Sequence, residues 1–538
     1  MPDPSQKFED TSKRIVGNFL QTAVFVDDKA FIDTPPGEEE FGNLPLDVKK
    51  VMDVFAKNEM ICSVLKPKPG DDTDIFDSVK LASKRADVVV LDWNIHRDRG
   101  KTTTKIIQSI IDEDENQNGR LRLIVIYSSQ PPYKSGSNPF VKIGNEFSDF
   151  VEDNNFFALQ KKHCRIAFFH KTESNIDELP EFIISEFTKI TAGLLSNVAL
   201  ESISVIRDNT HLLLGSLGRE IDPAYLAHRA LLPFPDDAMD HAVDIVASEL
   251  QSILENYQVG KKADKDTILG WLDANSIDKN YKINYTNKQT GLDAVTEVGL
   301  DKIEKLLGKG FSKARESIKY ECSFEAGQTK MECIGLDAFK HLTKTFCLNG
   351  EDEDEINCKY AILASQKNHY GRPENAPILT LGTVLKKISG PNPVEGYDYW
   401  ICIQPRCDCV RITRPRNFIF LPLEIVNENG FGLIIEDENG FKKLKLIQKN
   451  YQSNSFRFSG ADSDDKIVRA IKDGDEFYFT SEEGQRFLWL TELKTEHAQR
   501  ISNEMAANLS RVGVNESEWL RLWSRVNINN PRSEITDN

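Results

Sequence analysis

Short apolar segments alternate with helix-forming segments through the first third of the chain, and this alternation restricts the fold more than any other feature. Residues 87–92 include four consecutive apolar residues with no polar alternation, which is typical of a strand buried on both faces. The pattern predicts a parallel sheet with helices on both faces. The five expected strands are 22–28, 61–65, 87–92, 121–128 and 165–171.

Polar side chains stand at the ends of four of these expected strands. Asp27 and Asp28 end the first strand, Asp92 the third, Ser128 the fourth and Lys171 the fifth. In open parallel sheets, ligands bind beyond the carboxyl ends of the strands, where the strand order reverses. We therefore expect these five side chains to meet in one pocket.

These residue types match what phosphoryl transfer to a carboxylate requires. The reaction needs a carboxylate nucleophile, a divalent cation to offset repulsion between anions, and donors around the phosphoryl oxygens. Mg²⁺ prefers oxygen ligands, which Asp27, Asp28 and Asp92 can supply. Any one strand-end aspartate is more often a turn or cap residue. The prediction therefore depends on all five residues occurring in this order.

The set resembles the receiver domain of two-component response regulators, which has a flavodoxin-like (βα)5 fold. The resemblance covers roughly residues 20–190. It implies that Asp92 is the phosphoacceptor, that Asp27, Asp28 and Asp92 hold Mg²⁺, and that a histidine kinase is the phosphodonor. It further implies that Ser128 and Lys171 contact the phosphoryl group.

Two more positions match the family, and a few depart from it. Gly100 corresponds to the loop glycine after the acceptor, and Phe168 to the aromatic switch residue that acts with Ser128. Ser129 is adjacent and is an alternative switch hydroxyl. The family usually has Met-Pro where this chain has Ile95 and His96, and a proline where Thr172 follows the lysine.

The segments that join the expected strands also differ from the family. The segments 29–91 and 129–170 are longer than typical receivers allow, and an extra helix precedes the first strand. Receivers often form homodimers through the face beyond the fourth and fifth strands. The second insertion lies next to that face, so a homodimer stays an open expectation.

Bulk composition narrows the class of protein. The chain has 538 residues, 40% hydrophobic and 28% charged, with a net charge of −17. Such acidity argues against nucleic acid or anionic lipid as the main partner. No apolar run approaches the ~20 residues that span a bilayer. The nine scattered cysteines indicate reduced thiols and a cytoplasmic location rather than a disulfide framework.

Changes in periodicity along the chain predict a multidomain architecture of α/β, then α, then β. After a receiver domain at 1–195, we expect a helical domain at 196–317 and a β-rich domain at 318–490. Short strands with Gly, Asn and Pro between them indicate an antiparallel barrel or sandwich in the latter. A C-terminal helical hairpin is expected at 491–526 and a disordered tail at 527–538.

Three weaker signals have ordinary structural explanations. His211 begins a His-Leu-Leu-Leu-Gly stretch that faintly resembles a phosphotransfer pattern, although a helix-surface histidine is the simpler reading. Cys402, Cys407 and Cys409 lack the usual zinc spacing, so buried thiols are favoured over a metal site. An arginine cluster at 406–416 reads as a solvated strand edge or a contact for an acidic partner.

Residues 200–538 contain no P-loop, nucleophile elbow or other catalytic motif, so an enzyme is not expected there. The architecture is similar to the receiver proteins of Detocs-type antiphage phosphorelays, one of which acts as a phosphate sink. That resemblance implies a sink or buffer, with a second receiver or effector protein as a further partner. The alternatives are an effector switched on by phosphorylation and a scaffold with a degenerate receiver.

Overall fold

The computed structural model divides into two compact units, residues 1–340 and 341–538. The first unit contains a mostly parallel sheet and the central helices, and the second contains an antiparallel sheet. The structure describes residues 4–31, 46–67, 72–116, 119–129, 139–153, 158–161, 163–171, 175–275, 280–286, 293–314, 319–323, 329–333, 339, 341–348, 350–368, 376–389, 397–427, 430–438, 440–461 and 466–509.

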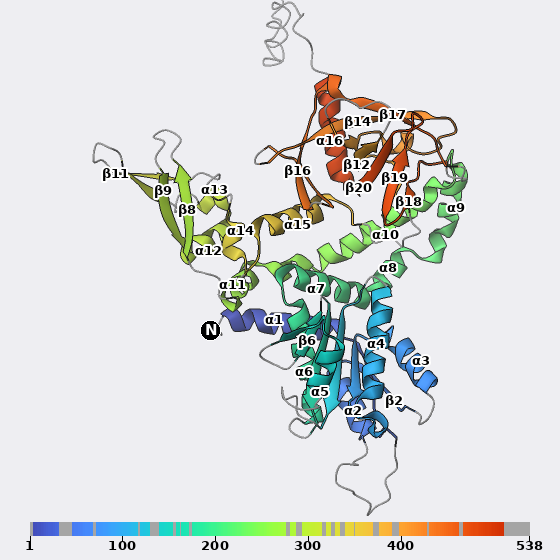
Figure 1. The fold of residues 1–538 in the computed structure, drawn as a ribbon, viewed down its shortest axis with the longest axis vertical. Coiled ribbons are helices and arrows are strands. Elements are labelled where there is room, and N and C mark those ends of the chain that lie inside the picture. Colours follow the sequence, from blue (N-terminus) through green and yellow to red (C-terminus); the bar gives the residue numbers. More distant parts are fainter. Residues whose placement is uncertain are drawn as a thin grey trace, which may run out of the picture. The chain divides into compact units, whose positions relative to one another are not determined.

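Five parallel strands form the centre of the first unit: β1 (Thr22–Val26), β2 (Ile61–Leu65), β3 (Val88–Asp92), β4 (Arg122–Ser128) and β7 (Cys164–His170). Their order across the sheet is β2-β1-β3-β4-β7 (Figure 1), so it reverses between β1 and β3. Every neighbouring pair in this set is parallel. This is the flavodoxin-like order, which confirms the fold class predicted for the N-terminal part.

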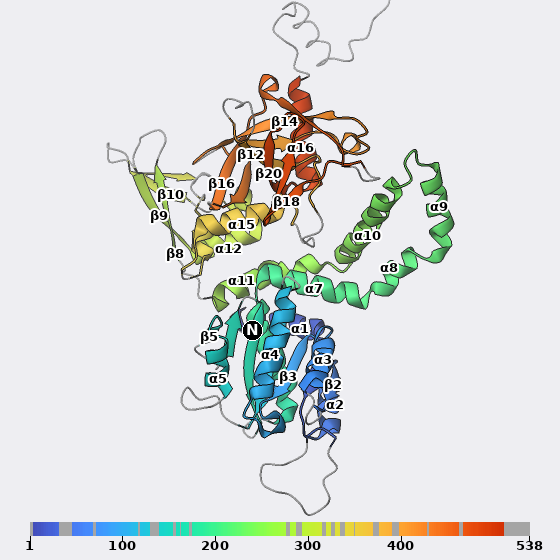
Figure 2. The same ribbon diagram turned by 45° about the vertical axis from the view of Figure 1, so that its right-hand side comes forward.

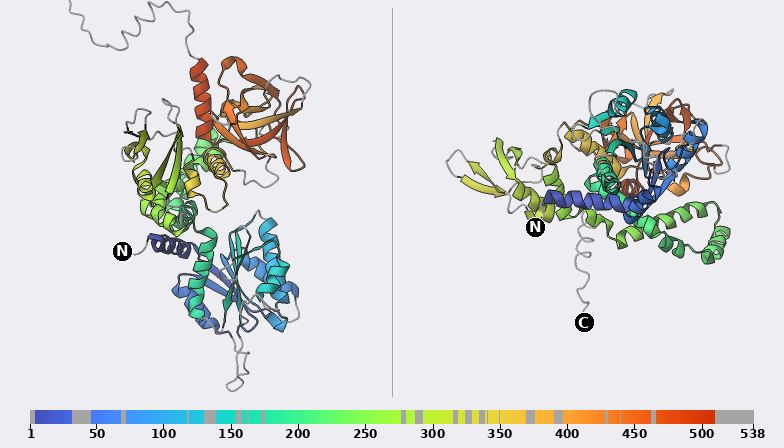
Figure 3. Two further views of the ribbon diagram at one scale, coloured as in Figure 1. Left: turned by 60° about the vertical axis from the view of Figure 1, so that its left-hand side comes forward. Right: turned by 90° about the horizontal axis from the view of Figure 1, so that it is seen from below.

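Helices cover both faces of this sheet (Figure 3). They are α1 (Pro4–Phe19), α2 (Val48–Lys57) and α6 (Leu179–Thr191) on one face, and α3 (Asp72–Ser83), α4 (Lys101–Asn116) and α5 (Pro139–Glu146) on the other. Alternate residues of β3 enter alternate cores: Val88 and Val90 pack toward the first set, Val89 and Leu91 toward the second. The unbroken apolar run of β3 follows directly from this double burial.

An antiparallel hairpin extends the sheet beyond its fifth parallel strand. It consists of β5 (Val151–Asp153) and β6 (Ala158–Lys161), and β6 pairs with β7. Ala158 packs into one core and Leu159 into the other. The hairpin lies within the long segment between β4 and β7. The sequence revealed the length of that segment but not its strands, because they are only three and four residues long.

The central helices belong to the same unit as the sheet. α7 (Leu194–Asp208) and α11 (Lys265–Ala274) both pack on α1. The buried Asn197 of α7 donates from Nδ2 to Ser12 Oγ at 2.9 Å. Between α7 and α11 the chain forms α8 (Thr210–Ser216), α9 (Asp222–Leu231) and α10 (Asp237–Asn256), which follow α7 as a curved row of helices (Figure 2).

The region expected to be helical over 196–317 also contains strands. β8 (Asn280–Thr286) pairs with β9 (Asp293–Gly299), ahead of α12 (Leu300–Lys309) and α13 (Phe311–Ala314). A second hairpin, of β10 (Lys319–Ser323) and β11 (Thr329–Cys333), lies just beyond this region, within the stretch 318–490 that was expected to be β-rich. In the sequence of β8, Tyr281, Ile283 and Tyr285 alternate with polar residues, which is the two-residue period typical of a strand. The prediction of a helical region overlooked this period.

The second unit is built on nine antiparallel strands. They are β12 (Thr383–Ser389), β13 (Tyr399–Cys402), β14 (Arg416–Ile425), β15 (Leu433–Asp437), β16 (Gly440–Leu446), β17 (Asn454–Phe458), β18 (Ile471–Asp473), β19 (Glu476–Thr480) and β20 (Arg486–Glu492). The sheet order is β15-β16-β14-β13-β12-β20-β19-β18, and β17 pairs with β14. The predicted antiparallel sheet is therefore confirmed.

Of the expected barrel or sandwich, the barrel is not closed, because the pairings among the described strands leave β15 and β18 as open edges. β18 has only three residues, all exposed, and it pairs with β19 alone. α16 (Thr495–Leu509) instead covers part of one face, where Ala498 and Met505 join the core with Leu381 and Leu493. The helix thus buries apolar side chains that the sheet itself would bury if it closed into a barrel.

The other expectations for the C-terminal part fall partly inside and partly outside the described residues. α14 (Thr343–Phe346) and α15 (Glu353–Ser365) precede the sheet, and α16 corresponds to the first half of the expected helical hairpin. The rest of that hairpin and the expected tail lie outside the described residues. In the part of the chain that the structure describes, no helix is both long and apolar enough to cross a bilayer.

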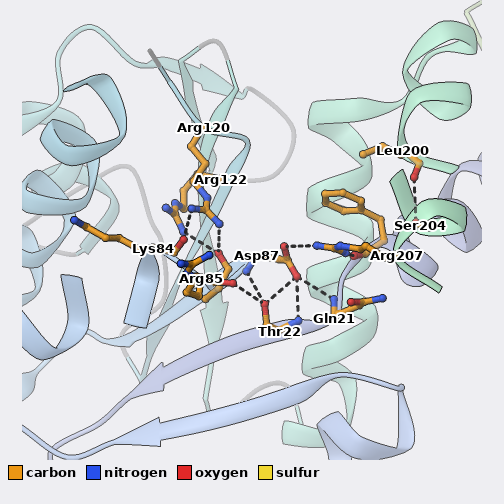
Figure 4. A network of polar contacts seen from close by, with 12 residues as sticks. Gln21, Thr22, Lys84, Arg85, Asp87, Arg120, Arg122, Leu200, Ser204 and Arg207 are labelled. Atoms are coloured by element: carbon orange, nitrogen blue, oxygen red, sulfur yellow. Dashed lines mark hydrogen bonds and ion pairs between the residues drawn. The ribbon is translucent and has the colours of Figure 1, made fainter. Parts of the chain in front are cut away.

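A polar network fixes the amino-terminal ends of the strands to α7 (Figure 4). The Asp87 carboxylate, just before β3, accepts hydrogen bonds from the amides of Gln21 and Thr22 and from the Thr22 hydroxyl, each at 3.0 Å. Arg207 of α7 lies 3.5 Å from Asp87 and donates to the carbonyl of Phe19 at 2.6 Å. Asp87 therefore links β1, β3 and α7 at the amino-terminal edge of the sheet, opposite the edge at which Asp27 and Asp92 lie.

Replacing Asp87 with alanine should lower the free energy of local unfolding around β1 and β3 by about 1–3 kcal/mol, because buried donors lose their acceptor. Native-state hydrogen exchange of the β1 and β3 amides measures this change. Asp266→Ala is the matched control. It removes an exposed partner of Lys7 and should change the same quantity by less than about 0.5 kcal/mol. Equal effects of the two variants would contradict the assignment.

Candidate functional site

Three of the predicted site residues are in direct contact at the carboxyl edge of the parallel sheet. Val26 pairs with Leu91, so Asp27 and Asp92 end neighbouring strands. Lys171 follows β7, and its side chain reaches back past β4. Its Nζ lies 2.8 Å from Asp92 Oδ1 and 3.3 Å from Asp27 Oδ2. The strand order thus brings together residues that are 144 positions apart in the sequence.

Tyr127 supports this lysine, a role that the sequence interpretation missed. The Lys171 ammonium lies 4.4 Å from the centre of the Tyr127 ring, within the range of a cation–π contact. The ring is itself held between Phe25, at 5.2 Å, and Phe169, at 5.9 Å between centroids. Tyr127 is the register partner of Asp92 on β4, a pairing between strands that no local sequence motif marks.

Asp28 contacts the loop that follows β3. The backbone amide of His96 donates to Asp28 Oδ2 at 2.9 Å, and His96 Nδ1 lies 3.7 Å from the same oxygen. The other oxygen, Asp28 Oδ1, is buried and has no hydrogen-bond partner among the described residues. His96 thus has a definite place in the site, at one of the positions where the chain departs from the receiver pattern.

The loop between β3 and α4 has an unusual backbone. His96, Arg97 and Arg99 all have positive φ values, of 54°, 58° and 58°. Gly100 has φ +84°, and a Cβ there would lie 2.3 Å from ring atoms of the buried Trp93. A side chain at position 100 is therefore excluded by both conformation and space. The glycine that sequence reasoning singled out has a clear physical basis.

A buried hydroxyl holds the backbone at Asp92. Thr103 Oγ1, in the first turn of α4, lies 2.7 Å from the carbonyl oxygen of Asp92 and 3.1 Å from that of Trp93. Thr103 is fully buried. Asp92 itself is only 4% exposed, so its carboxylate is presented by a rigid strand end rather than by a loose loop.

Ser128 and Phe168 lie on the strands next to the cluster. Ser128 is buried at the end of β4, whereas Ser129 is exposed, which favours Ser128 as the site hydroxyl. The carbonyl of Ser128 accepts a hydrogen bond from the Lys171 amide at 2.8 Å. Phe168 points into the core beneath α5, where its ring meets Phe140 edge to face at 5.5 Å. The structure does not test the switch roles expected for Ser128 and Phe168.

Burial and charge shape the protonation of the cluster. Burial raises the pKa of Asp27 and the nearby Asp92 raises it further, while Lys171 only partly offsets them. For Lys171, burial lowers the pKa, but the carboxylates of Asp92 and Asp27 outweigh that effect and the net pKa is raised. The lysine is therefore held as a cation, and the carboxylates around it carry more negative charge than it can neutralise.

The site has the donor set of a divalent-cation centre. One carboxylate oxygen from each of Asp27, Asp28 and Asp92 lies within 4.8 Å of the others, and these residues are the one such group among the described residues. Hard oxygen ligands suit Mg²⁺. Carboxylates that are arranged around a cation site have unpaired oxygens and raised pKa values when no cation is bound. The unpaired Asp28 Oδ1 and the raised pKa of Asp27 fit this description. The residues present therefore fit the ion.

The cysteines singled out from the sequence do not gather into a metal site in the described part of the chain. Cys402 and Cys409 are buried free thiols, and Cys407 is exposed. Cys409 Sγ donates to the carbonyl of Pro405 at 3.3 Å. Burial raises the pKa of the Cys402 thiol well above its usual value, which favours the protonated, unreactive form.

The remaining sequence candidates also have local explanations. Arg406 Nη2 donates to Thr495 Oγ1 at 2.9 Å, and Arg416 Nη1 donates to the Asp408 carbonyl at 2.8 Å. His211 is exposed on α8, seven residues long. The exposed helical position of His211 agrees with its simpler interpretation, whereas Arg406 lies in the turn Arg406–Asp408 rather than on a strand edge, and Arg416 begins β14.

Comparison with known proteins agrees with the geometry of the strand tips. No curated protein matches this chain in a sequence comparison. Residues 19–175 match the family described as the response receiver domain. The matched region contains all five strand-tip residues and the whole parallel sheet. This chain therefore contains, over residues 19–175, a receiver domain of the response-regulator type.

Proposed function

We propose that Asp92 of this receiver accepts a phosphoryl group from the phosphohistidine of a histidine kinase. The observation that carries the proposal is the contact of Lys171 with Asp92 at 2.8 Å, beside two further carboxylates. A buried carboxylate that touches both a cation and a cation-binding cluster is suited to nucleophilic attack on phosphorus. The Lys171 ammonium and a bound cation would also compensate the negative charge of the aspartyl phosphate product.

The proposed reaction follows from these positions. An Asp92 oxygen attacks the phosphorus atom, the phosphorus–nitrogen bond breaks, and the imidazole of the kinase leaves and takes up a proton. The Lys171 ammonium, freed from the carboxylate, pairs with a phosphoryl oxygen. The Ser128 hydroxyl donates to another. Thr103 and Gly100 keep the acceptor backbone fixed while this happens.

Asp27, Asp28 and Asp92 would hold the Mg²⁺ ion. When bound, the ion offsets repulsion between the incoming phosphoryl oxygens and the carboxylates. Through its amide, His96 positions Asp28, leaving Oδ1 available as a ligand.

For the whole chain we propose a phosphate sink or buffer in an antiphage phosphorelay, acting through protein contacts with the kinase and a second receiver protein. The architectural similarity to Detocs-type receiver proteins supports this. So does the sequence of residues 200–538, which contains no recognised catalytic motif. An effector activated by phosphorylation is the competing proposal, and a direct test separates the two.

The native protein, incubated with Mg²⁺ and acetyl phosphate, should gain the mass of one phosphoryl group, and Asp92→Asn should gain none. Intact-protein mass spectrometry gives the result. Asp112→Asn, a substitution of the same kind on the exposed surface of α4, is the matched control and should be phosphorylated normally. Phosphorylation of Asp92→Asn at the native rate, or no phosphorylation of the native protein by either acetyl phosphate or its kinase, would contradict the proposal.

A sink should compete with other acceptors of the same kinase. With the kinase limiting, adding the native protein should lower phosphorylation of a second receiver severalfold, and adding Asp92→Asn should not. Radiolabel transfer in a reconstituted mixture measures this. Cell death on expression of the native protein with an active kinase, absent with Asp92→Asn, would favour an effector over a sink.

Cation affinity should depend on pH in a defined direction. The ion requires a deprotonated Asp27, and burial raises the pKa of that carboxyl, so protons compete at a higher pH than for an exposed aspartate. Mg²⁺ should therefore bind more weakly at about pH 5 than at about pH 7.5, as measured by calorimetry. Asp27→Asn should bind more weakly and show a flatter pH dependence. Unchanged affinity in that variant would remove Asp27 from the ligand set.

A further inference from the structure

The helices that follow α7 expose an unusual amount of apolar surface. From 210 to 250, where the structure describes every residue, Ala238 is the one buried side chain. Large apolar side chains are exposed on all three helices of the stretch and on the links between them: Leu212, Leu214, Ile221, Leu226, Leu231, Phe234, Met239, Val243 and Ile245. Exposed apolar surface on this scale marks an interaction site in soluble proteins.

α10 organises part of this surface into a regular seam. Met239, Val243, Val246, Leu250 and Ile253 follow one another at alternating intervals of four and three residues. This is the heptad spacing with which one helix packs along another. Ile253 is buried at the base of the seam, whereas Met239 is 53% and Val243 67% exposed. The seam is therefore open along its N-terminal half.

The C-terminal end of α10 is anchored to α7, so one end of the seam is fixed in position. Ile253 is buried, and the hydroxyl of Tyr257, just beyond the helix, donates to Asn209 Oδ1 at the end of α7. α7 is in turn tied to the receiver sheet by Arg207. The open half of the seam thus extends from a helix that the receiver holds in place.

The charge beside the seam is of one sign. Asp240 lies along one border and Glu249 along the other, Asp237 and Asp244 lie farther round the helix, and α10 contains neither Lys nor Arg. A second copy packed on this seam would bring carboxylates against carboxylates. A helix with Lys or Arg beside its own apolar stripe would meet complementary charge instead.

We propose that the seam of α10 is a docking site for an amphipathic helix of a partner protein, with basic residues bordering its apolar stripe. The apolar side chains Met239, Val243 and Val246 pack between those of the partner helix, and the flanking carboxylates select its charge. This interaction uses neither Asp92 nor the cation cluster, so it stands independently of the proposed phosphoryl transfer.

The test uses the full chain and two synthetic helical peptides of about three heptads, with Leu at the seam positions. One peptide carries Lys at the flanking positions and the other carries Glu. Fluorescence anisotropy should show binding of the Lys peptide, with the Glu peptide at least about tenfold weaker. Val243→Ser should weaken binding of the Lys peptide about tenfold. Ile245→Ser, the same kind of change off the seam, should leave it unchanged.

Charge reversal gives a second, independent readout. Asp240→Lys should weaken binding of the Lys peptide and strengthen binding of the Glu peptide, a swap that simple unfolding cannot produce. Equal binding of the two peptides, or native-like binding by Val243→Ser, overturns the proposal. So does a concentration-dependent dimer, seen by light scattering, that Val243→Ser dissociates and Ile245→Ser does not, because the occupant is then a second copy.

Discussion

The ion pair between Lys171 and Asp92 is the interaction on which the site depends, and it exists only because of the strand order. β3 and β7 are not neighbours, and the lysine crosses β4 to reach Asp92. It does so over the face of Tyr127, which is held by aromatic rings on both sides. The parallel register, the aromatic core and the charge cluster are therefore one arrangement. A shift of β7 by one residue would turn Lys171 to the other face of the sheet.

Much of this arrangement was open to prediction, because parallel strands bring their carboxyl ends to one edge. Asp27, Asp28, Asp92, Ser128 and Lys171 could be placed from apolar runs and the residues that end them. Tyr127 could not be recognised as easily, since its importance comes from pairing with Asp92 across strands rather than from any local motif. Similarly, the His96 contact with Asp28 depends on left-handed backbone that no propensity rule anticipates.

Prediction weakened where elements are short or where burial is decided by distant contacts. β5, β6 and β18 are each three or four residues long, too short to show a period. In the second unit, the individual strands were mostly recognisable from apolar runs, but closure of a sheet is a property of its edges. The short, exposed β18 is one of those edges, and it is not evident from strand patterns alone.

The two ends of the receiver sheet do different physical work. The carboxyl end concentrates negative charge around one lysine, an arrangement that is useful for chemistry and costly for folding. At the amino end, the buried carboxylate of Asp87 accepts hydrogen bonds from backbone amides and pairs with Arg207, which fixes α7 to the sheet. Beyond α7 the chain continues as α8, α9 and α10, whose large apolar residues are mostly exposed rather than packed in a core. The open seam of α10 thus starts from a helix end that is held in place, which is the geometry that the proposed docking of a partner helix requires.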